Sequence, residues 1–240
     1  MTVDAAAWEA LRLSLWVACW ATVLAVPLAL WVAWLLARRS FRGKAVLNAL
    51  VHLPLVLPPV VTGYLLLIAF GRTAPIGRLL ESLGMGLAFH WSGAVLAAII
   101  MGFPLMVRAM RLAIEAVDPK LEDAAATLGA PRAAIFARVT LPLIMPGILA
   151  GAVMGFAKAM GEFGATITFV ANIPGQTQTL PSAIWTALQI PGGEGQAAVM
   201  VVMACIVALA AVALSEALAR RVAARIAAAD EPSGRHSPPL

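Results

Sequence analysis

The stretch VDPKLEDAAATLGAPRAAIFARVTLPLIMP, residues 117–146, decides how the rest of the sequence is interpreted. It is amphipathic and carries many charges, whereas the sequence on either side of it is almost entirely apolar. Asp118 is suited to cap a helix whose first residue is Pro119, because a missing N–H costs nothing at that position. Gly129 stands where a left-handed residue would end that helix. These signals predict a short helix that ends at a glycine turn.

The residues after the glycine turn predict a second short helix. Pro131 is suited to open it, and Pro142 and Pro146 are expected to interrupt it. The predicted helix pair is polar and lies between long apolar segments. We therefore expect it to lie in the aqueous phase and to dock against another protein.

The composition of the chain is typical of a membrane protein. Its 240 residues are 62% hydrophobic and 12% charged, with a mean hydropathy of +0.91. Soluble domains carry about 25% charged residues, which disfavours a soluble globular protein. The net charge of +5 does not indicate nucleic-acid binding, because the basic residues cluster at the edges of apolar runs. Cys19 and Cys205 lie within apolar segments without metal-ligand spacing and are interpreted as small hydrophobic residues.

Five apolar stretches are long enough to cross a bilayer, which takes about 20 helical residues. They predict an all-α, polytopic membrane protein with a single membrane-spanning domain at residues 1–226. The first stretch is too long for the apolar region of a signal peptide, so it is interpreted as a retained span. A tail rich in Pro and Ser, residues 227–240, is predicted to be disordered. The predicted spans are residues 10–37, 45–71, 88–113, 143–170 and 195–219.

The basic residues predict the orientation of these spans. With the N-terminus outside the cell and the C-terminus in the cytoplasm, thirteen of the 17 Lys and Arg residues lie on the cytoplasmic side. Arg12, Arg72 and Arg78 then lie outside, and Lys158 falls within a span. This asymmetry is the one that the positive-inside rule favours. The predicted helix pair at 117–141 is therefore expected on the cytoplasmic side.

Residues 172–193, between the last two spans, contain no charged side chain. Residues 181–190 can form a helix, but one too short to cross a bilayer. Two interpretations stay open. The segment is either an external or re-entrant cap over the bundle, or an ordinary loop packed by its own apolar residues.

The sequence lacks the patterns expected of an enzyme. It contains no G-x-x-x-x-G-K-S/T phosphate-binding loop and no G-x-S-x-G nucleophile motif. Its three histidines are scattered and form no metal-ligand pattern. We therefore expect no catalytic residue, no metal and no cofactor held by this chain, and no ATP hydrolysis of its own.

Two charged residues fall inside the predicted fourth span. Lys158 and Glu162 are four residues apart, which places them on one helix face and within reach of each other. Each costs about 2.5–3.5 kcal/mol at a bilayer centre, so both should face protein or water. They form either a mutually neutralising structural pair or part of a polar pathway. Further candidates for lining such a pathway are Thr62, Gly63, Gly164, Ala165, Thr166 and Thr168.

The charged stretch resembles the cytoplasmic signature loop of ABC importer permeases, which reads E-A-A, three residues, G, nine residues, I-x-L-P. The spacing matches throughout, with Asp123 in place of Glu and Val139 in place of Ile. In that family the loop is a coupling helix that fits a groove on the ATP-hydrolysing subunit. The resemblance assigns this role to Glu122, Asp123, Ala124, Ala125, Gly129, Leu141 and Pro142.

The resemblance extends over most of the chain and is closest to molybdate permeases. It is carried by residues 54–67, 70–77, 103–130 and 161–185, and the GEFGAT run also resembles sulfate and thiosulfate permeases. Lys158 stands where relatives are expected to have Arg, so a positive charge remains without a bidentate contact. Sulfate, thiosulfate or tungstate transport is the nearest alternative. A stand-alone secondary anion transporter and a structural membrane anchor are alternatives from other classes.

The resemblance also implies partners and a location. It implies a bacterial inner (plasma) membrane protein, a separate ABC ATPase subunit that hydrolyses ATP, and a periplasmic molybdate-binding protein. A second permease copy is expected, forming a homodimer in the membrane lipid. Transport would then proceed by alternating access, driven by the ATPase subunits through the two coupling helices.

Overall fold

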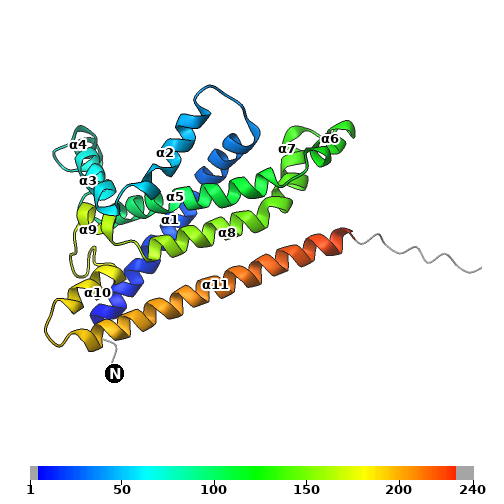
Figure 1. Ribbon diagram of the computed structural model, residues 1–240. Helices are drawn as coiled ribbons and strands as arrows, with labels where there is room; N and C mark the ends of the chain where they lie inside the picture. The colour runs from blue at the N-terminus through cyan, green and yellow to red at the C-terminus, as the bar shows by residue number, and fades with distance from the viewer. Residues whose placement is uncertain (1–4, 231–240) are drawn as a thin grey trace, which may run out of the picture.

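The computed structural model describes residues 5–230, with the backbone alone at 215, 219 and 222–230. Within this part every regular element is a helix and no strand occurs, which confirms the predicted all-α class. Figure 1 shows the helices along the chain. In order they are α1 (Ala5–Arg38), α2 (Lys44–Val56), α3 (Pro59–Phe70), α4 (Pro75–Ser82), α5 (Trp91–Glu115), α6 (Pro119–Thr127), α7 (Arg132–Ile135), the π-helical turn η1 (Phe136–Thr140), α8 (Leu141–Met160), α9 (Gly164–Val170), α10 (Leu180–Leu188) and α11 (Glu194–Asp230).

The centre of the bundle consists of α1, α5 and α8, which pack against one another. Small residues line their contact faces, because van der Waals contact between closely spaced backbones replaces the hydrophobic effect inside a bilayer. On α8 the contact face carries glycines that meet α5, and a Cβ at Gly147 would clash with that of Ala113. On α1 the small buried residues recur at helical spacing: Ala7, Ala10, Ser14, Ala18, Ala21, Ala25, Ala29 and Ala33.

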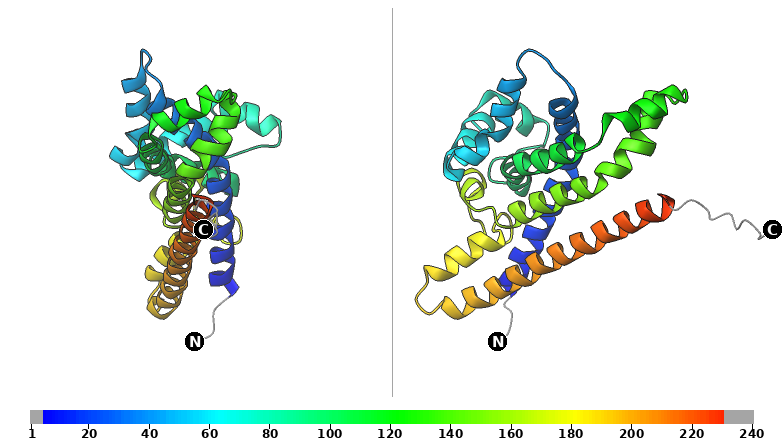
Figure 2. Two further views of the ribbon diagram at one scale, coloured as in Figure 1. Left: turned by 90° about the vertical axis from the view of Figure 1, so that its right-hand side faces the viewer. Right: turned by 45° about the vertical axis from the view of Figure 1, so that its right-hand side comes forward.

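The long helix α11 lies at the edge of this bundle, along the outside of the molecule (Figure 2). In its most apolar part 11% of the residues are buried, against 61% in α5. Its outward residues are nevertheless apolar, as at Ile206 and Leu209. A helix with an exposed apolar surface of this kind fits a lipid environment.

Four helices are long and apolar enough to cross a membrane, and the α2–α3 pair is a fifth candidate bent by 115°. The predicted span at 45–71 is therefore broken in its middle rather than straight. Leu57 and Pro58 have extended backbones between the two helices. The consecutive prolines explain this break, since neither Pro58 nor Pro59 has an N–H and each disfavours the helical conformation in the residue before it.

The predicted fourth span, 143–170, also differs. A continuous helical segment begins at Arg132, runs through η1 into α8 and ends at Met160. Pro142 and Pro146, expected to interrupt the helix, instead lie within it. The π-helical turn just before Pro142 accommodates the proline ring, because there the Leu141 N–H bonds to the carbonyl of Phe136, five residues back.

The segment between the last two spans forms part of the bundle end. The predicted short helix is observed as α10, and its residues share an apolar cluster with α1 and α11. The Leu180 N–H donates to Ser14 Oγ of α1 at 2.7 Å. The cap interpretation therefore fits better than a loop packed by its own residues.

The helices at the chain ends set the remaining bounds. The third span, predicted from residue 88, begins at Trp91, and the fifth, predicted from residue 195, begins at Glu194. Helix α11 extends to Asp230, so the predicted tail does not begin at 227. Residues 231–240 of that tail lie outside the described residues.

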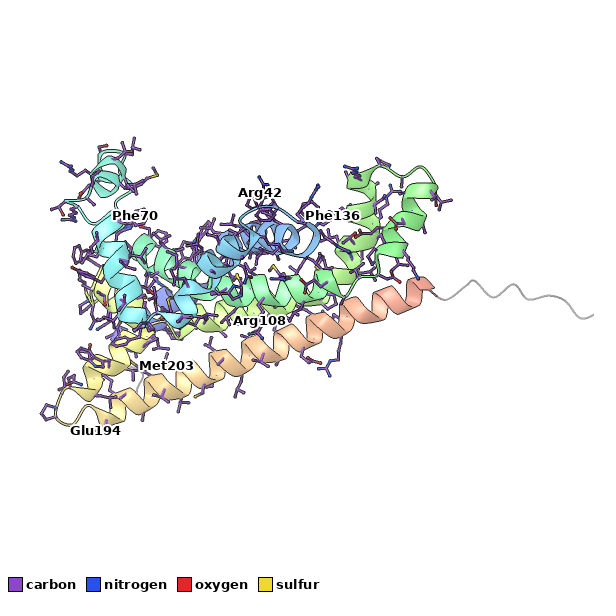
Figure 3. The ribbon with its side chains drawn as sticks, turned by 45° about the horizontal axis from the view of Figure 1, so that its top comes forward. Arg42, Phe70, Arg108, Phe136, Glu194 and Met203 are labelled. Carbon is purple, nitrogen blue, oxygen red and sulfur yellow. The ribbon has the colours of Figure 1, made fainter. Side chains whose placement is uncertain are left out.

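The bundle has two distinct ends. Figure 3 shows Phe136, next to α6 and α7, at one end and Glu194, at the start of α11, at the other. Helices α4 and α10 lie at the same end as Glu194 (Figure 1). The charged sequence stretch thus projects from the bundle at the end opposite α10.

The α5–α8 contact gives a test of this packing. Replacing Gly147 with Leu should lower the melting temperature in detergent, because overpacking a tight contact costs about 1–3 kcal/mol. Ala150→Leu, at an exposed position of the same helix, is the matched control and should leave the melting temperature nearly unchanged. Equal effects of the two substitutions would contradict the α5–α8 interface described here.

Candidate functional site

The predicted caps of the charged segment are present in the structure. Asp118 Oδ1 accepts a hydrogen bond from the Lys120 N–H at 3.0 Å, and Pro119 is the first residue of α6. Gly129 has a φ of +82°, the left-handed conformation that ends the helix. Helices α6 and α7 therefore form the predicted pair around a glycine turn.

Helix α6 is an open surface that projects from the bundle. None of its residues, all of which are described, is buried. Asp123 and Ala124 are exposed, Ala125 is half-buried, and just beyond the helix Leu128 is 89% exposed. Exposed apolar side chains on a projecting polar helix can fit into the groove of a partner protein.

Glu122 differs from its neighbours because its side chain faces its own chain. Its Oε1 accepts a hydrogen bond from Thr140 Oγ1 at 2.7 Å and one from Arg38 Nη2 at 3.2 Å. Leu141 and Pro142 are half-buried at the start of α8, where Leu141 packs against the core. The structure thus divides the seven predicted coupling residues into an outward group around Ala124 and an inward group around Glu122.

The second candidate site lies at the break between α8 and α9. Lys158 Nζ is 2.8 Å from Glu162 Oε2, a contact that is ionic rather than an aligned hydrogen bond. The Glu162 side chain is 2% exposed and that of Lys158 is 29% exposed. The four-residue spacing alone had placed Glu162 on the same helix face as Lys158. Because α8 ends at Met160, Glu162 instead lies just beyond the helix, although it does reach Lys158.

Glu162 also organises the start of α9. Its Oε1 accepts a hydrogen bond from the Ala165 N–H at 2.9 Å. That N–H is one of the groups that a helix start leaves without a partner in the helix. One buried carboxylate therefore neutralises Lys158 and caps the backbone of α9.

The other predicted pathway residues gather where α9 packs on α3. A Cβ at Gly63 would lie 2.5 Å from the Ala165 carbonyl oxygen, so the two backbones are in close contact. Thr62 and Thr166 are buried, and Thr168 Oγ1 donates to the Gly164 carbonyl oxygen at 3.0 Å. Thr62 Oγ1 is buried with no hydrogen-bond partner among the described residues. In the single chain these groups are packed rather than open to a channel.

The sequence as a whole matches one protein family. Residues 25–227 match the family described as "Binding-protein-dependent transport system inner membrane component". The chain belongs to this family.

Two relatives are similar over most of their length. The chain is 55% identical over 214 residues to the molybdenum transport system permease protein ModB of Escherichia coli strain K12, covering 89% of this chain and 93% of the relative. It is 52% identical over 215 residues to the protein of the same name from Haemophilus influenzae, covering 89% and 94%. These relatives are transport permeases.

A solved structure has the same fold. A chain in the crystal structure of a bacterial alginate ABC transporter, in complex with an alginate pentasaccharide-bound periplasmic protein, superposes with a TM-score of 0.70. The identity is 18%, and the match covers 89% of this chain and 78% of that one. The all-α arrangement of this binding-protein-dependent permease is thus shared with an ABC importer.

Sequence reasoning missed two residues of the site in this permease. Arg38 and Thr140 hold Glu122, yet neither belongs to the signature pattern. Arg38 stood out only as the charge that ends the first span, and it lies 84 positions from Glu122 in sequence. No local spacing could have paired them.

Sequence reasoning also missed a hollow at the opposite end of the permease. Its largest part, of about 600 Å³, lies between the start of α1 and the loop before α10. Adjoining hollows of about 340 and 360 Å³ share residues with it or with each other. Polar or aromatic residues that line these hollows include Glu9, Arg12, Trp16, His90, Gln176 and Gln178.

The dual role of Glu162 can be tested by stability. Glu162→Ala removes the ion pair and leaves a backbone N–H of α9 without its partner, which should cost about 1–3 kcal/mol. Glu162→Gln keeps an oxygen acceptor for Ala165 and should cost less. The measurement is the melting temperature of the purified protein in detergent.

A matched control is Glu81→Ala, which breaks the exposed ion pair with Arg72. Exposed pairs contribute about 0–1 kcal/mol, so this variant should melt near the wild-type temperature. A Glu162→Ala variant as stable as Glu81→Ala would show that the buried carboxylate has no structural role.

Proposed function

We propose that this chain is the membrane-spanning permease subunit of an ATP-driven molybdate importer. The observation that carries the proposal is the projecting helix α6, whose exposed residues around Ala124 offer a docking surface on a protein that is otherwise apolar. The 55% identity to a molybdenum transport permease supports the substrate. The chain itself contributes no ATPase site, and a separate ABC ATPase subunit hydrolyses the ATP.

The two ends of the bundle differ in a way that suits a cytoplasmic side and a periplasmic side. The end with α6 carries Arg38, which bonds to Glu122 of α6 and is followed in sequence by Arg39, Arg42 and Lys44, as a cytoplasmic surface requires. The opposite end, with the N-terminus and the hollow beside α10, is then periplasmic and faces a molybdate-binding protein. Two permease copies, as a homodimer in the inner membrane, enclose the pathway between them.

Transport follows from these contacts as alternating access. ATP binding draws the two ATPase subunits together, and the docked α6 helices move with them. That movement switches the bundle between states open to the cytoplasm and to the periplasm. A ligand shifts such an equilibrium only through a difference in its affinity for the two states. Here the ligand is ATP, which binds to the ATPase subunits and favours the state in which they are drawn together.

The α8–α9 break supports a pathway that releases its anion easily. Glu162 neutralises Lys158 at 2.8 Å, so the pair presents little net positive charge to an oxyanion. Uncharged hydroxyls such as those of Thr166 and Thr168, which are packed in this structure, would accompany an anion without holding it tightly once the pathway opens. Strong binding inside the permease would slow release, and the binding protein can supply the affinity instead.

The direct test is ATP hydrolysis by the reconstituted complex of permease, ATPase and binding protein in proteoliposomes. Molybdate should stimulate hydrolysis and accumulate inside the vesicles, whereas sulfate should stimulate it much less. Tungstate, which shares the charge and shape of molybdate, is compared in parallel. Stimulation by sulfate alone would overturn the substrate, and uptake by the permease without ATP or partners would overturn the importer.

The glycine turn provides a second test. Gly129→Val should lower molybdate-stimulated ATP hydrolysis, because a β-branched residue resists the observed φ of +82°. Apart from Gly129 and its two chain neighbours, no described residue has a heavy atom within 4 Å of a Cβ at this position, so the effect would be conformational rather than steric. Gly129→Asn is the matched control, since Asn tolerates this conformation and should retain most of the stimulation. Equal activity of the two variants would exclude a role for the turn in coupling.

A further inference from the structure

Three side chains from separate parts of the chain meet beneath α6. Glu122 Oε1 accepts hydrogen bonds from Thr140 Oγ1 at 2.7 Å and from Arg38 Nη2 at 3.2 Å. Arg38 Nη2 also donates to the Val117 carbonyl oxygen at 3.4 Å. The Arg38–Glu122–Thr140 cluster therefore joins α6 to the last residue of α1, to the linker after α5 and to the residue that precedes α8.

The side chains of the cluster are largely shielded from solvent, most completely at Thr140. The side chains of Arg38 and Glu122 are 19% and 28% exposed, and Thr140 is 2% exposed. Val117 and Thr140 are both buried. Charge-assisted hydrogen bonds in such a site are stronger than those on an open surface, because water competes less for the groups.

Apolar packing gives α6 little hold on the transmembrane helices. None of its described residues is buried, and its main packing neighbours are α7 and η1. Its direct links to α1 and to the start of α8 are the hydrogen bonds of Glu122. A force applied to the exposed face of α6 can therefore reach α1 through one carboxylate, whereas it can reach α8 both through that carboxylate and through α7 and η1, which are continuous with α8.

We propose that the Arg38–Glu122–Thr140 cluster is the side-chain link that transmits movement of α6 to α1 and, together with the continuous segment α7–η1, to α8. Glu122 is a positioning residue that holds its own chain, and the outward residues around Ala124 bind the ATPase. The inference rests on the proposed function, since it presumes that a partner moves α6. It predicts that breaking the cluster uncouples ATP hydrolysis from transport while the ATPase stays bound.

The test uses the full complex in proteoliposomes and measures molybdate taken up per ATP hydrolysed. This ratio does not depend on how much folded complex is present, so a loss of stability alone would not change it. Glu122→Ala should lower the ratio by about tenfold, the effect expected from losing hydrogen bonds to a charged group. The ATPase should co-purify with the variant as it does with the wild type.

Charge exchange provides the decisive variant. Arg38→Glu combined with Glu122→Arg restores an ion pair between α1 and α6, and it should recover the ratio to within about threefold of wild type. The control is Glu115→Ala, which breaks the ion pair of Arg111 and Glu115 within α5. It removes one carboxylate near the same end of the bundle and should leave the ratio unchanged.

The remaining outcomes would each contradict the proposed link or the proposed function. If Glu122→Ala loses the ATPase and the exchange does not recover it, Glu122 contacts the ATPase directly and the proposal is wrong. A wild-type ratio in every variant would show that the cluster transmits no movement. Should Glu122→Ala accumulate poorly, Glu122→Gln replaces it, because it keeps an acceptor for Thr140 while removing the charge that pairs with Arg38. Absence of molybdate-stimulated hydrolysis in the wild type would instead refute the proposed function.

Discussion

A backbone inside a bilayer has no water to satisfy its N–H and C=O groups, and this constraint shapes every irregular point of the structure. Just before Pro142 the chain adopts a π-helical turn and continues as α8. At Pro58 and Pro59 it bends by 115° into a second helix. At the α8–α9 break the Glu162 carboxylate accepts a hydrogen bond from a freed N–H. At each departure from regular helix, the freed backbone groups thus find a partner within the chain or the irregular segment is short.

The same constraint separates the packed bundle from its working surface. Small residues let α1, α5 and α8 approach closely, so the centre can be held by van der Waals contact alone. The charged helix α6 lies at one end, where it stands free of the bundle, and the charges of Lys158 and Glu162 inside the bundle are paired with each other. This geometry suits a binding-protein-dependent permease. Such a protein needs a surface that a partner can move, and a firm link from that surface to its membrane helices. Glu122 supplies the link in this chain.

Local signals in the sequence predicted the elements whose cause is local. Asp118 and Gly129 fixed the ends of α6 because caps depend on a few neighbouring residues. Proline was a weaker guide, since Pro104 lies inside a continuous helix whereas Pro58 ends one. The inward position of Glu122 could not be predicted, because its partner Arg38 lies 84 residues away. Long-range pairs of this kind become visible only when the helices are packed together.

We infer that α6 is the cytoplasmic segment through which a partner protein moves the bundle. The most direct measurement places a cysteine at Ala124, in a chain whose Cys19 and Cys205 have been replaced by serine. A membrane-impermeant thiol reagent is then applied to right-side-out and inside-out vesicles. The claim predicts labelling in inside-out vesicles alone, and protection when the ATPase subunit is bound. Labelling from the outer side, or no protection by the ATPase, would contradict it.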